Sequence, residues 1–171
     1  MAKKVFTLGL ASIKGGAVGA QASALAEFGY TYQDSCKMTQ EDAETTDFFA
    51  EEVDDPVVST SRAGKTTFEF SLMDPSPDTM KDLMGGTASK SSTELTDNDQ
   101  WEATDKAPNI EMQLEITPEQ GLKFAIARAK IEAKINAEFS KKGILLIDVK
   151  ATVLKPSTGK KIVATVIPAA S

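Results

Sequence analysis

The chain has no histidine, one cysteine and one tryptophan among its 171 residues. Without histidine it lacks the commonest general base, the commonest metal ligand and the usual partner of a nucleophilic serine or cysteine. The single cysteine, Cys36, cannot form an internal disulfide or, alone, a zinc site. Its many carboxylates are crowded into one run, whereas a glycosidase needs two isolated acids in a cleft. We therefore expect no enzyme, no metal site and no cofactor.

Long apolar runs are also missing. No segment approaches the roughly 20 apolar residues that a membrane-spanning helix needs. The N-terminus imitates a secretory signal, but Lys14 and two glycines interrupt the apolar stretch, and the lone cysteine fits a reducing compartment. We expect a single domain over residues 1–171, with no membrane contact.

Charge is divided unevenly along the chain. Residues 1–119 carry 22 acidic and 9 basic side chains, whereas residues 120–171 carry 3 acidic and 10 basic ones. The two parts can simply fold together, or an acidic face of one copy can meet the basic face of another. A contact between two different patches builds rings or filaments.

Strict alternation marks two segments as strands. From Ala127 to Phe139 every odd residue is apolar and every even residue is polar, and Ile110–Ile116 alternates in the same way. A period of two is typical of a strand with one buried face. The helix-forming composition of the first segment also fits a helix followed by a strand. We weigh the period above propensity and predict a long hairpin of Ala127–Phe139 with Ile144–Leu154.

The remaining segments are assigned from composition. Residues 1–26, rich in small residues, predict an N-terminal arm or loop with a short strand at Val5–Leu10. Further strands are predicted at the following segments: 29–39, then Pro56–Arg62 paired through a short turn with Lys65–Met73, and finally Lys161–Ile167.

One helix has clear end signals. Ser76 suits the N-cap, Pro77 the first helical position and Asp78 the positive end of the helix dipole, while two glycines follow residue 84. The helix is therefore predicted over residues 77–84, and the polar residues 87–106 predict a long loop with a short strand around Trp101. The sequence as a whole predicts a mainly β fold: an antiparallel β-sandwich or barrel, with its core over residues 28–167 and one flanking α-helix.

Residues 41–55 form an acidic block without a basic residue, and they include Phe48, Phe49 and Val53. The spacing does not fit a calcium-binding EF-hand loop. The block is either a solvated loop or a docking segment. Beyond it, Gly64-Lys65-Thr66 resembles the end of a phosphate-binding loop, but Ser59 stands where that motif needs glycine, and a strand pattern follows. We expect no nucleotide site.

Two sequence segments and the order of the elements between them resemble a known protein family. The run FEFSLMDPSPDTMKDLMGGT (residues 68–87), the polar loop and alternating strand after it, and the hairpin ending in GILLIDVKATVLKP resemble the major tail tube proteins of long-tailed, siphovirus-like phages, in particular those of Bacteroides-type phages and prophages. The resemblance covers roughly residues 28–167 and lies in element order and short motifs. It implies a β-sandwich or barrel with one flanking helix.

The resemblance also implies a function. Subunits of this family form six-membered rings that stack into a hollow tube, with an inner sheet wall shared among subunits, and the tube conducts DNA. The implied location is the virion, with assembly in the bacterial cytoplasm. The implied partners are further copies of the chain and the tape measure, tail terminator and distal tail proteins, with DNA only in transit.

Candidate contact residues follow from charge and resemblance together. The bore of a DNA conduit is expected to be mainly acidic, so that the duplex slides. The Arg128–Glu138 face has a basic excess, so the expected bore-lining residues are Glu111, Gln113 and Glu115. The expected contacts between copies are Glu41, Asp42, Glu44, Asp47, Phe48, Phe49, Glu51 and Glu52 on one side, and Arg128, Lys130 and Lys134 on the other. A segment that orders on stacking is implied, with residues 1–26, 41–55 and 87–106 as candidates.

A function of another class stays open. A monomeric β-sandwich binding module, of the carbohydrate or adhesin type, would need an exposed aromatic platform. Trp101, Tyr30 and Tyr32 are the residues that could supply one. Growth in size with protein concentration would separate the two functions, because only a tube subunit assembles without a fixed end point.

Overall fold

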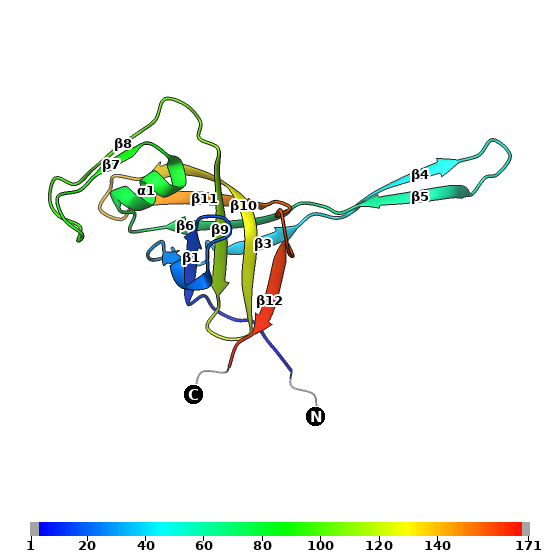
Figure 1. Ribbon diagram of the computed structural model, residues 1–171, viewed down its shortest axis with the longest axis horizontal. Helices are drawn as coiled ribbons and strands as arrows, with labels where there is room; N and C mark the ends of the chain where they lie inside the picture. Colours follow the sequence, from blue (N-terminus) through cyan, green and yellow to red (C-terminus); the bar gives the residue numbers. More distant parts are fainter. Residues whose placement is uncertain (1–3, 169–171) are drawn as a thin grey trace.

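The computed structural model describes residues 4–168. The first three residues of the predicted N-terminal arm and the last three of the domain lie outside the described residues. Antiparallel strands dominate the described chain, together with one α-helix and a three-residue 3-10 turn at Ala22–Ala24. The mainly β fold with one flanking helix is confirmed (Figure 1).

The long hairpin predicted near the carboxyl end is present. Strand β10 (Leu122–Ala137) pairs antiparallel with β11 (Leu145–Val153), and Ala129 lies opposite Val153. The helical alternative for this segment is therefore wrong. A bulge between Ile126 and Ala129 changes which side chains of β10 are buried: the even-numbered Ile126 is buried before the bulge, and the odd-numbered Ala129 after it. Such an extra residue bends a strand, and here it lets β10 serve two layers.

The two layers share β10 and cross steeply (Figure 1). The first layer contains β2 (Ala26–Glu27), β1 (Ser12–Gly16), β9 (Ile110–Thr117), the first half of β10, and β12 (Ile162–Val166). The second contains the other half of β10, then β11, β6 (Thr66–Leu72) and β3 (Lys37–Gln40). The arrangement is a sandwich in which one bent strand joins the sheets at their corner.

The core lies between these layers. Leu114 and Ile126 of the first layer are fully buried, as are Leu72 and Ile147 of the second. Helix α1 (Pro77–Met84) adds the buried Leu83. These side chains come from positions that alternate along their strands, so each strand turns its other side chains away from the core.

Helix α1 begins and ends where the sequence predicts. The Ser76 hydroxyl accepts a hydrogen bond from the Thr79 N–H (3.2 Å), and Gly85 ends the helix with φ +75°. The predicted loop over residues 87–106 contains a short ribbon of β7 (Thr87–Ser89) and β8 (Gln100–Glu102). Trp101 lies in it, as predicted, and its indole N–H donates to the Gly85 carbonyl (2.8 Å).

The prediction of residues 1–26 as an arm or loop is wrong for its middle part. Strand β1 pairs with β9 and buries Ile13 in the core, whereas Val5–Leu10 makes only an isolated bridge at Leu8. The glycines of β1 have a packing reason, because a Cβ on Gly15 would overlap the Phe28 ring. Glycine here indicates close approach and not flexibility.

Two further strand predictions need correction. Pro56–Arg62 forms β5, but it pairs with β4 (Glu44–Phe49) inside the acidic block and not with the next strand. The block is therefore a hairpin and not a loop, because uncharged or basic residues face its acids: Asp47 lies opposite Ser59 and Glu44 opposite Arg62. The strand predicted over residues 29–39 is reduced to β3, since Asp34 adopts φ +59° and turns the chain.

Candidate interaction surfaces

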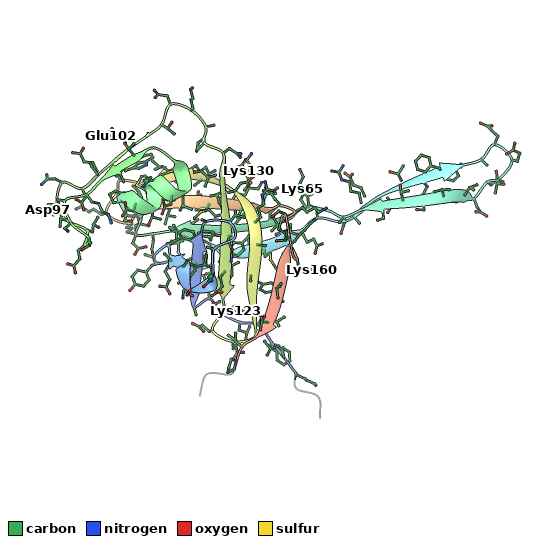
Figure 2. All side chains as sticks on the ribbon, in the orientation of Figure 1. Lys65, Asp97, Glu102, Lys123, Lys130 and Lys160 are labelled. Atoms are coloured by element: carbon green, nitrogen blue, oxygen red, sulfur yellow. The ribbon has the colours of Figure 1, made fainter. Side chains whose placement is uncertain are left out.

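Strands β4 and β5 form an arm that leaves the body of the molecule (Figure 1). The arm continues the β3–β6 pair, and the Glu41 N–H donates to the Lys65 carbonyl (2.9 Å) at the junction. Figure 2 shows Lys65 at this neck. A Cβ on Gly64 would overlap the Glu41 carbonyl oxygen, so glycine is required where the two strands approach. The apparent phosphate-loop motif is thus explained by the neck of the arm.

The arm exposes large apolar side chains. Phe48 is 54% exposed and Phe49 is 63% exposed, and Val53, Val57 and Val58 are exposed beside them. A two-stranded hairpin is marginally stable in water, and a concentration of exposed apolar groups indicates a binding surface. These features favour the docking interpretation of the acidic block over the solvated loop.

The acidic residues occupy both ends of the arm. Glu51 and Glu52 lie in the turn at its tip, and Glu41 and Asp42 lie at its neck. Between them, Asp47 accepts a hydrogen bond from the Ser59 hydroxyl. Within residues 4–168 no ion pair joins an arm carboxylate to a basic residue. The arm therefore presents acidic and apolar groups together.

The second layer has a polar face whose charges alternate from strand to strand. One row of directly opposed residues runs across all four strands and consists of Glu132, Lys150, Glu69 and Lys37. Lys37 Nζ lies 3.3 Å from Glu69 Oε2, and Lys130 Nζ lies 3.4 Å from Glu132 Oε1. Opposite charges that face each other across strands stabilise a sheet. A hollow of about 560 Å³ lies over this face.

The polar face also holds a hydrogen-bonded cluster. The Ser71 hydroxyl donates to Asp148 Oδ1 (2.6 Å), and the Asn136 amide donates to Asp148 Oδ2 (3.1 Å). Lys134 lies directly opposite Asp148. The basic excess of β10 noted in the sequence is therefore balanced on this face by carboxylates of neighbouring strands.

The predicted bore residues lie in the other layer. Glu111 accepts two hydrogen bonds from Arg128, both 2.7 Å, and Glu115 lies 3.6 Å from Lys123 Nζ. The hydrogen bonds from Arg128 lower the pKa of Glu111, and Glu111 raises the pKa of Arg128 in return. Gln113, half-buried, lies between the two acids on β9. Two of the three predicted bore residues are thus already paired with cations.

The predicted contact residues do not gather at one place within a single chain. All eight from the acidic block lie on the arm or its neck, whereas Arg128, Lys130 and Lys134 lie along β10. Figure 2 shows Lys130 on the body, away from the arm. Arg128 is held by Glu111 and Lys130 lies 3.4 Å from Glu132 of its own chain, so Lys134, which forms no salt bridge within residues 4–168, is the freest of the three cations.

A cavity that the sequence did not predict lies between the layers, beside β3. It encloses about 730 Å³, and its lining includes Tyr30, Tyr32, Met38 and Phe124. Tyr30 is 74% exposed. The sequence named both tyrosines as candidates for an exposed aromatic platform, and they are the signal that could have indicated this cavity. Trp101 lies apart, bound to the end of α1, and is not part of an aromatic platform with the tyrosines.

The described residues offer little for catalysis. None of the His, Cys, Asp and Glu side chains in residues 4–168 cluster in threes as a metal site would require. Burial raises the pKa of Cys36 to about 11, so its thiol is protonated at neutral pH. In the same range no helix is long and apolar enough to cross a bilayer.

Comparison with models of known protein families and with curated proteins found no match for this chain.

Proposed function

We propose that the chain is a structural subunit of a phage tail tube, whose copies join into rings and stack into a hollow conduit for DNA. The observation that carries this proposal is the β4–β5 arm. Its apolar side chains lie outside the core, and among residues 4–168 no salt bridge joins its acids to a cation. A segment of this kind is complementary to a surface that is both apolar and basic.

A second copy supplies such a surface. The carboxyl-terminal part of the chain carries the basic excess, and Lys141 and Lys142 lie at the tip of the β10–β11 hairpin. The exposed apolar Phe139 lies in the same tip. Because arm and hairpin are different patches, their contact is heterologous, and it propagates into a ring or a stack.

The bore is best formed by the polar face of β3, β6, β11 and β10. This face is hollowed, and its cations are interrupted by acids, as in the row of Glu132, Lys150, Glu69 and Lys37, so a passing duplex would meet no continuous cationic stripe. The bore assignment of Glu111, Gln113 and Glu115 is less favourable, since Arg128 and Lys123 neutralise the two acids. We therefore place these three residues outside the bore. The proposed partners are further copies of the chain and the tail proteins named by the resemblance.

The decisive experiment measures particle size against concentration. Purified protein is examined by sedimentation velocity and negative-stain microscopy over a wide concentration range. A tube subunit forms rings or tubes whose length grows with concentration, whereas a solitary particle at every concentration would refute the proposal.

A second candidate function is favoured by the cavity beside Tyr30 and Tyr32. Aromatic side chains at the mouth of a cavity are suited to stack on sugar rings, as a carbohydrate-binding module requires. This function predicts a monomer whose tyrosine fluorescence changes on titration with oligosaccharides. Binding that is lost in Tyr30→Ala and Tyr32→Ala variants, without assembly, would favour it over the tube.

A further inference from the structure

Two strand edges of the second layer lack a partner among the described residues. One is the edge of β3 that faces away from β6, and the other is the edge of β10 from Glu132 to Ala137, beyond the point where β9 begins at Ile110. Neither stretch contains a proline or a bulge, two of the devices that block edge pairing; β3 is short, and each stretch carries a lysine whose charge lies on the polar face. Both edges are therefore able to accept a strand from outside.

The directions of these edges suit a ring. Every neighbouring pair in the order β10, β11, β6, β3 is antiparallel, so β3 and β10 run in opposite directions. A copy that is related by rotation about an axis along the strands keeps its strand directions. Its β10 therefore meets β3 of the first copy antiparallel, and no strand has to reverse.

We propose that β3 of one copy pairs with the free half of β10 of the next, with Met38 directly opposite Ile135. This inference rests on the proposed self-assembly and specifies its register. Both side chains lie on the apolar side of their strands, yet Met38 is 41% exposed and Ile135 is 48% exposed. Pairing in this register covers each with the other, and it places Lys37 beside Asn136 and Thr39 beside Lys134.

Neighbouring registers fit less well. A shift by one residue would turn the apolar side chains to the polar face. A shift by two towards β9 places Lys37 opposite Lys134. It also places Gln40 opposite Ile131, whose backbone on that edge is already paired with Ile110 of β9. A shift by two the other way would pair Glu41 with Lys134, but it leaves Ile135 opposite the polar Gln40 and Met38 opposite the small Ala137.

The proposed register has one like-charge neighbour pair. It brings Glu41 beside Glu132, at the end of β3 where the neck begins. Glu132 is flanked there by Lys130 at 3.4 Å and by Lys150 directly across the strands. The two carboxylates thus share a pair of cations, which reduces their repulsion.

The same register agrees with the geometry of closed sheets. Within one copy, Lys37 lies in the same row across the strands as Glu132. The proposed pairing sets Lys37 opposite Asn136 of the next copy. The row is therefore displaced by four residues along β10 for every four strands that it crosses. That offset is about 13 Å along strands for about 19 Å across them, which tilts the strands by about 35°. Closed barrels have tilts of about 35–45°.

Disulfide trapping tests the register directly. In a Cys36→Ala background, the pair Met38→Cys and Ile135→Cys is compared with Met38→Cys combined with Ala133→Cys or with Ala137→Cys. Within one chain Met38 and Ile135 are about 14 Å apart across two intervening strands and about 13 Å apart along them, roughly 19 Å in all, so a bond can only join copies. The expected result is a ladder of linked chains from the first pair alone, lost on reduction.

A charge test needs no cysteine. Thr39→Lys should raise the protein concentration needed for assembly about two- to fivefold, because the new lysine faces Lys134, and Thr39→Glu should lower it by a similar factor. In the register shifted towards β9 the two effects would be reversed, since Thr39 then faces Glu132. Lack of effect from both variants would also overturn the inference.

The outcomes separate the register from the function. Assembly of the wild-type chain together with a ladder from a control pair, or with no ladder, overturns the register and leaves the tube proposal standing. Absence of assembly by the wild-type chain overturns both. If the cysteine variants fail to assemble while the wild type succeeds, the two Thr39 variants decide whether the register is correct. It is supported if Thr39→Lys raises the assembly concentration and Thr39→Glu lowers it, and any other result overturns it.

Discussion

Replacing the two phenylalanines of the arm should uncouple assembly from folding. In the Phe48→Thr, Phe49→Thr variant, threonine is a good strand former because it is β-branched, but it removes the aromatic surface. A fully buried phenylalanine contributes about 1.5–3 kcal/mol. Since the two side chains are 54% and 63% exposed in the monomer, docking has about 2.5 kcal/mol left to gain from the pair.

Losing about 2.5 kcal/mol of docking free energy corresponds to about a 60-fold increase in the concentration at which assembly begins, at 1.4 kcal/mol per factor of ten. The free energy of unfolding of the monomer should change by less than about 0.5 kcal/mol, because neither side chain belongs to the core. Light scattering against concentration gives the first quantity, and urea denaturation gives the second.

The matched control replaces two similarly exposed apolar residues outside the arm, in Val163→Thr, Val166→Thr on β12. Both variants lose apolar surface that is accessible in the monomer, but only the arm variant should lose assembly. An unchanged assembly threshold in the arm variant would refute the reasoning, and so would an equal loss in both variants, since assembly would then follow general surface hydrophobicity.

Three further predictions concern other parts of the chain. Reversing Lys130 and Lys134 to glutamate should abolish tubes in negative-stain micrographs while circular dichroism shows a folded monomer. The reason is that both cations lie on β10 beside the proposed junction with β3 of the next copy, where two new glutamates would repel Glu41. Alkylation of Cys36 in the monomer at pH 8 should be up to about 100-fold slower than that of an exposed cysteine, because burial raises the pKa of the thiol from 9.0 to about 11 and only the thiolate reacts. The rate should rise with pH until the pH nears 11. Fast alkylation at pH 8 would contradict this prediction. Ser76→Ala should lower the free energy of unfolding by about 1 kcal/mol through loss of the helix cap, and Ser76→Asp should retain it; equal stability of the two variants in thermal denaturation would count against the cap.

The helix and the alternating strands could be predicted because their signals are local. Ser76 and Gly85 mark the ends of α1 within the sequence itself, and β9 alternates without interruption. The bend of β10 could not be predicted in the same way. Its apolar run Ala125–Ala127 carries no mark of the bulge, which only shows as a change from even to odd buried positions.

The arm and β1 show the opposite case, in which local signals favour the wrong structure. Like charges suggest that residues 41–55 repel one another, but each strand of a hairpin is stabilised by residues on the other strand. The glycines of β1 suggest a flexible arm, but Phe28 packs against Gly15 and requires it. Both errors come from partners that are distant in the sequence, and contacts between copies are more distant still.

The arm has to be largely ordered before it docks. Its strands have six and seven residues, and fixing their backbone at about 1 kcal/mol each would cost more than 10 kcal/mol. Covering its five exposed apolar side chains returns only about 5 kcal/mol. Docking of side chains alone therefore cannot fold the arm. The cross-strand ladder, the Glu41–Lys65 hydrogen bond and the close approach at Gly64 supply the order in advance, so most of the apolar gain remains available for association.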